Sequence, residues 1–65
     1  MMQTLITEHR KKPGRGWQMA RQLPANDPNW SPADLAWINT MMETGDSTLT
    51  VGDTMYQQQW IRETN

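Results

Sequence analysis

The chain contains no cysteine, no phenylalanine and a single histidine, His9. Without cysteine there is no disulfide and no Cys-ligated zinc site, and the lack of thiols fits a reducing compartment. Of the two serines, Ser31 occupies an expected helix N-cap, and the spacing of Ser47 from His9 does not indicate a Ser-His-Asp triad. We therefore expect no enzymatic activity, with no catalytic, cofactor-binding or metal-binding residue.

Long apolar runs are also missing. No segment approaches the ~20 consecutive apolar residues that span a bilayer. Residues 1–6 have neither the basic nor the apolar region of a secretory signal. The sequence therefore predicts a cytoplasmic location without membrane association.

Apolar residues are scarce overall, at 35% of 65 residues. One domain of this size has a marginal core, because ordering it costs on the order of 100 kcal/mol at ~1.5 kcal/mol per residue. Four tryptophans are present, each able to bury ~200 Å², and we interpret them as a small core built on indoles. Alternatively, one or two of them lie at an interface, and a homodimer would relieve the shortage of core. The four are Trp17, Trp30, Trp37 and Trp60.

Residues 31–44 are predicted to form a helix. Ser31 is placed at the N-cap and Pro32 at the first helical position, and the Asp34 carboxylate can reach back to the N-cap amide. Trp30 before the cap can pack on Leu35 as a hydrophobic staple. Gly45 follows as a stop signal. Apolar residues recur at helical spacing in two adjacent series, Leu35-Ile38-Met42 and Ala33-Trp37-Met41.

Residues 47–62 are predicted to form a hairpin. Thr48–Val51 and Thr54–Ile61 are the strands, and Gly52-Asp53 between them has the order typical of a type II′ turn. In this register Val51 lies opposite Thr54 and Leu49 opposite Tyr56. One face, assigned to the core, carries Leu49, Val51, Tyr56 and Trp60, and the other carries Met55, Gln57, Gln59 and Ile61.

Residues 1–23 are interpreted as a basic hairpin or arm. Residues 3–9 alternate as a strand does, residues 12–16 have the composition of a turn, and a second strand follows in which Trp17, Met19, Arg21 and Leu23 alternate with polar or small residues. Two alternatives make residues 17–23 a short helix or residues 10–16 a mobile arm. The predicted architecture is a single α+β domain of order β-β-α-β-β, with one helix on an antiparallel sheet of three or four strands.

The charges are divided along the chain. Residues 1–23 carry a formal charge of +4 and residues 24–65 a formal charge of −5. Cations punctuated by glycine and proline suit phosphate binding, and the tryptophan beside them can stack on an unpaired base. We therefore expect a small non-enzymatic regulatory or accessory protein that contacts DNA or RNA through Arg10, Lys11, Lys12, Arg15, Trp17 and Arg21.

Two other interpretations stay open. The basic turn is equally typical of a solvated loop whose charges block edge pairing. The divided charge, together with exposed tryptophan, also fits an adaptor or inhibitor that docks on a larger protein partner. Small free-standing domains of this sort are common among mobile-element accessory proteins, and this comparison is an analogy that no residue of the chain predicts.

Overall fold

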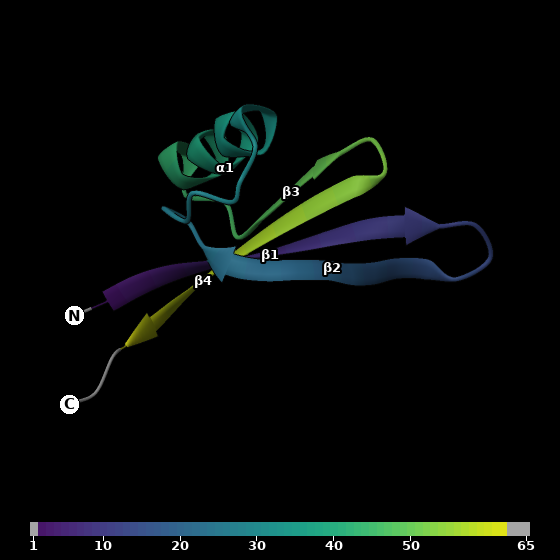
Figure 1. Cartoon of the computed structure of the whole chain (residues 1–65), viewed down its shortest axis with the longest axis horizontal. Coiled ribbons are helices and arrows are strands. Elements are labelled where there is room, and N and C mark those ends of the chain that lie inside the picture. The colour runs from purple at the N-terminus through teal and green to yellow at the C-terminus, as the bar shows by residue number, and fades with distance from the viewer. Residues whose placement is uncertain (1, 63–65) are drawn as a thin grey trace.

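The computed structural model describes residues 2–62. The elements are β1 (Met2–Lys12), β2 (Gly16–Pro24), α1 (Pro32–Thr44), β3 (Thr48–Val51) and β4 (Thr54–Arg62). All strand pairs are antiparallel, and the strands lie in the order β2-β1-β4-β3 with the helix against one face of the sheet (Figure 1). The predicted α+β fold and its order of elements are confirmed, with four strands.

The first hairpin is longer than predicted. β1 continues to Lys12, which pairs with Gly16, and residues 17–23 form a strand, so the helical alternative for this segment is wrong. The interpretation of residues 10–16 as a mobile arm is also wrong for residues 10–12, which pair within β1 and β2. Figure 1 shows this hairpin running out to one end of the molecule, away from the two termini.

The second hairpin has the predicted register. Leu49 pairs with Tyr56 and Val51 with Thr54. Gly52 has a φ of +60°, and no non-glycine residue has a positive φ among those described, so the turn has the type II′ signature and not that of type I′.

The helix has the predicted ends. The Ser31 side chain accepts a hydrogen bond from the Asp34 amide at 3.1 Å, and the Gly45 amide donates to the Met41 carbonyl at 3.0 Å. No helix within residues 2–62 is long and apolar enough to cross a membrane.

The core contains only one of the four tryptophans, so the prediction of a core built on indoles is wrong. Trp17, Trp37 and Trp60 are 38%, 42% and 61% exposed. The buried cluster consists of Ile6, Trp30, Ile38, Met41 and Tyr56.

The helix orientation explains part of this error. Asp34, Ile38 and Met41 are the buried helical residues, at spacings of four and three, and their face turns Trp37 and Met42 outward. The predicted stripes were displaced because a polar residue, Asp34, belongs to the buried face. On β4, Trp60 pairs with Thr4 near the start of β1 and is left exposed there.

A β-bulge divides β2 into two parts. Glu8 pairs with Arg21 and His9 with Met19, so Ala20 is an extra residue without a partner on β1. Directly opposed residues share a face, and therefore Met19 lies on the opposite face from Arg21. The single alternating series predicted for residues 17–23 is wrong at this point, since the bulge reverses which residues face the helix.

Candidate nucleic-acid interface

The first hairpin ends in a tight turn between Lys12 and Gly16. We call residues 10–16, which comprise this turn and the strand ends beside it, the basic tip. The Arg15 amide donates to the Lys12 carbonyl at 3.0 Å. Pro13 supplies the fixed φ of the first central position, and Gly14 with φ +72° supplies the second, which is the signature of a type II turn. The Lys11 amide donates to the Asp53 carbonyl at 2.8 Å, which ties the base of the tip to the second hairpin.

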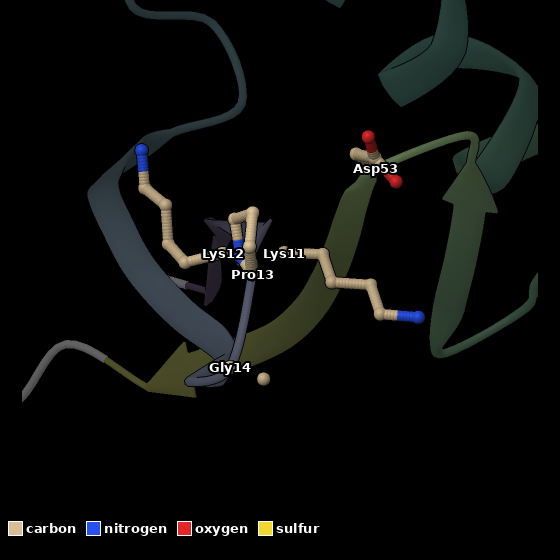
Figure 2. Close-up of a pocket in the computed structure, with 6 residues that line it drawn as sticks. Lys11, Lys12, Pro13, Gly14 and Asp53 are labelled. Atoms are coloured by element: carbon tan, nitrogen blue, oxygen red, sulfur yellow. The ribbon is translucent and has the colours of Figure 1, made fainter.

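Three cations of the basic tip have no carboxylate partner among residues 2–62. Every residue from 10 to 20 is exposed, and Lys11, Lys12 and Arg15 form no salt bridge with any residue in the described part of the chain. Figure 2 shows the side chains of Lys11 and Lys12 pointing in opposite directions from the strand. The positive charge is therefore presented on both faces of the ribbon.

An open pocket of about 280 Å³ lies between the two hairpin ends (Figure 2). Its lining includes one acidic residue, Asp53, from the turn of the second hairpin. The Asp53 carboxylate is the negative charge that a phosphate entering this pocket would meet. The lining consists of Lys11, Lys12, Pro13, Gly14, Gly16 and Asp53.

Arg10 differs from the other tip cations because it is paired. Its guanidinium lies 3.6 Å from Oε2 of Glu8, a side chain that is only 1% exposed. That oxygen accepts no hydrogen bond from any residue in the described part of the chain. Moving Arg10 to a phosphate would leave a buried carboxylate oxygen without this countercharge, which makes Arg10 a poorer ligand than its exposed neighbours.

Arg21, which the sequence places with the nucleic-acid-binding residues, is half-buried and is held by contacts with the body of the protein. Its Nε donates to Glu8 at 3.0 Å and its second terminal nitrogen donates to Asp34 at 2.7 Å. The guanidinium also lies 4.5 Å from the centre of the Trp30 ring, within the range of a cation–π contact. These contacts satisfy Arg21 from three sides, so we leave it out of the proposed surface and assign it a structural role.

The Arg21 contacts belong to a polar network beneath the helix. The Tyr56 hydroxyl donates to Asp34 at 2.6 Å and the Ser31 hydroxyl donates to it at 2.9 Å. Burial alone would raise the pKa of Asp34, but hydrogen bonds from Tyr56 and Ser31 and the charge of Arg21 outweigh it and hold the pKa below the ordinary value of 3.8. Burial and the hydrogen bond to Asp34 raise the pKa of Tyr56 well above its ordinary value, so the hydroxyl stays a donor.

The network also contains residues that sequence reasoning missed. Gln58 is buried and donates to the carbonyls of Met41 and Asp46. No role was predicted for Glu8, yet it is the buried partner of Arg21. The pairing of these two opposite charges across neighbouring strands could have indicated the contact. Glu8 lies opposite Arg21 only if β2 contains the one-residue bulge.

Trp17 lies on the face of the sheet that the helix does not cover, which we call the open face. It pairs across the ribbon with Lys11, and the next row along the sheet is Met19, His9, Met55 and Thr50. Further rows carry Gln22, Thr7, Gln57 and Thr48, then Pro24, Leu5 and Gln59, then Gln3 and Ile61. None of these strand residues is acidic.

Of the six residues expected to contact nucleic acid, the structure groups five at one end of the molecule and separates the sixth. Arg10, Lys11, Lys12, Arg15 and Trp17 lie on the exposed ribbon. No protein-family model, curated protein or solved structure matches the chain. The geometry of the ribbon and of the open face is therefore the basis for assigning a function.

Proposed function

We propose that this protein is a small non-enzymatic binding protein that contacts nucleic acid through its basic tip. The contact residues are Lys11, Lys12 and Arg15, with Arg10 at the border of the surface and Trp17 beside it. The protein acts as a regulatory or accessory factor in the cytoplasm, and its target is a polyanion that meets one acidic residue at the tip, Asp53 in the lining of the pocket.

The observation that supports this proposal is that three of the tip cations are exposed and, within the described residues, have no carboxylate partner. Exposed charged side chains usually contribute little to stability. Here three exposed cations, which form no salt bridge within residues 2–62, lie on the turn at the far end of the first hairpin (Figure 1). A protein that binds nucleic acid needs cations free to displace condensed counterions. The arrangement supplies three of them within five residues.

The test is the salt dependence of binding. Fluorescence anisotropy with a labelled oligonucleotide should give a slope of log K against log salt of about −2 on single strands or −2.7 on duplex DNA for three phosphate contacts. The variant Lys11→Gln/Lys12→Gln/Arg15→Gln should keep the circular dichroism spectrum of the wild type and lose most of both the affinity and the slope. Unchanged affinity in the folded triple variant contradicts the proposal.

Two single variants form a matched pair for this test. Asp53→Asn removes a negative charge beside the tip, whereas Glu43→Gln removes one from the last turn of the helix. Both change the net charge equally, so only a local effect separates them. We expect Asp53→Asn to raise affinity several-fold and Glu43→Gln to change it by much less; equal effects would mean that overall charge, and not the tip, controls binding.

A protein partner is the second candidate function. The observation that favours it is the exposure of Trp37 and Trp60, since tryptophan is enriched at binding hot spots. A partner that docks through these residues would be captured by the wild type and lost with Trp37→Ala or Trp60→Ala, and its capture would be insensitive to the triple tip variant.

A further inference from the structure

We infer that the open face, continuous with the basic tip, binds single-stranded nucleic acid, with Trp17 as a stacking surface for an unpaired base. The inference rests on the proposed function and specifies its ligand. It starts from the β-bulge at Ala20, which turns Trp17 and Met19 onto the open face and away from the side of Arg21 and Glu8. Bulges commonly re-aim side chains next to functional sites.

The charge distribution favours a polyanion on this face. All acidic side chains in residues 2–62 lie on the helix side of the sheet, on the helix or in loops, and none lies on the open-face strand positions. The open face instead carries Lys11 and the half-buried His9, and it adjoins the unpaired cations of the basic tip. A nucleic-acid strand crossing this face would meet attraction at one end, where Asp53 is the adjoining carboxylate, and no repulsive carboxylate at the strand positions within residues 2–62.

The chemistry of the surface favours unpaired bases over a duplex. Trp17 is 38% exposed and Met19 64% exposed, and both present apolar surface beside Lys11. Aromatic side chains on a sheet stack with bases that a duplex keeps buried in its own stack. The neighbouring rows contain the amide of Gln57 and the hydroxyl of Thr48, which can donate to and accept from base edges, whereas the Gln22 amide donates to the Thr7 hydroxyl at 2.8 Å.

The size of the open face is also sufficient. From Lys11 to Gln3 along β1 is eight residues, or about 26 Å at ~3.3 Å per residue. This length accommodates several nucleotides, as in other single-strand-binding sheets whose sites cover about 4–16 nucleotides.

The experiment compares a labelled oligonucleotide of about 12 nucleotides, within that range of site sizes, with its duplex at one salt concentration. We expect the single strand to bind at least about tenfold more tightly than the duplex. The variant Trp17→Ala should lower single-strand affinity by about 5- to 100-fold, the range for one base–aromatic stack. Trp17→Phe should recover most of that loss. Trp60→Ala is the matched control because Trp60 is exposed on the opposite side of the sheet, and it should change the affinity less than twofold.

The outcomes separate this inference from the proposed function. Equal affinity for both forms, or no effect of Trp17→Ala in a variant that keeps its fold, overturns the inference, while sensitivity to the triple tip variant would still support the proposed function. Binding of neither form overturns both.

One further result would overturn the inference directly. If sedimentation shows a dimer that Met19→Glu converts to a monomer, the open face is covered by a second copy of the chain and not by a nucleic acid.

Discussion

Replacing Arg21 with alanine should destabilise the protein far more than replacing a cation of the basic tip. Arg21 is the countercharge of Glu8, whose side chain is 1% exposed, and of Asp34, whose side chain is 13% exposed. Removing one partner of a buried ion pair costs about 3–5 kcal/mol because a charge is left unpaired. Since the Arg21 side chain is itself 34% exposed, solvent screening places the expected loss near the lower end, at about 3 kcal/mol.

This loss is large for so small a protein. A chain of 65 residues has a total stability of about 3–10 kcal/mol at ~0.05–0.15 kcal/mol per residue. Urea unfolding followed by tryptophan fluorescence, with a slope of ~1 kcal/mol/M, should therefore show a midpoint lowered by about 3 M. The control Lys12→Ala should change the free energy of unfolding by less than ~0.5 kcal/mol. If Arg21→Ala unfolds at the wild-type midpoint, or no earlier than Lys12→Ala, Arg21 is not a structural residue.

Three other predictions concern pH, packing and the turn. Asp34 contributes stability that is complete above its ordinary pKa of 3.8 and is lost as pH falls through the lower pKa of the folded state. Tyr56 has a raised pKa, so its contribution to stability is present below pH ~10 and is lost as pH rises. Urea titrations across the pH range should therefore show flatter acid dependence for Asp34→Asn and flatter alkaline dependence for Tyr56→Phe, and unchanged slopes would exclude these groups. Trp30→Ala should lower stability by about 3–5 kcal/mol, because Trp30 is buried. Trp60→Ala should lower stability by less than ~0.5 kcal/mol, because Trp60 is exposed. Thermal unfolding measures both losses, and similar losses for the two variants would contradict the described core. Gly14→Ala should cost about 1–2 kcal/mol, because an L side chain is strained at φ +72° whatever space surrounds it; a neutral effect on the urea midpoint would mean that the turn adopts another type in solution.

The local elements could be predicted from the sequence because their signals are local. The cap residues Ser31 and Gly45 set the helix ends, and Gly52-Asp53 set the turn that fixes the pairing of Leu49 with Tyr56. Each of these signals acts within a few residues along the chain. Where such a signal was present, the structure agrees with the prediction.

The errors arose where the outcome depends on distant residues. Asp34 was assigned only to helix capping, yet it faces the sheet because Tyr56 and Arg21 satisfy its carboxylate. With Asp34 facing the sheet, the helix is oriented so that Trp37 is exposed. The bulge at Ala20 likewise reflects pairing between strands, and no composition or spacing within residues 17–23 reveals it.

For the candidate site, the sequence indicated the tip cations because they are clustered in the chain. It could not separate Arg21 from them, since Arg21 differs only in the acids that folding brings to it. It also could not show that Trp17 and Lys11 face the same way, which depends on the pairing across the ribbon.

The extra residue Ala20 sets which face of the sheet Trp17 occupies. A ladder that continued outward without a bulge from the pair of Glu8 and Arg21 would set Gln18 opposite Lys11, and Trp17 would then lie opposite Lys12 on the helix side. A slip of one residue in the outer part of the hairpin is therefore enough to carry Trp17 to the other face, while the inner pairing of Arg21 with Glu8 stays unchanged.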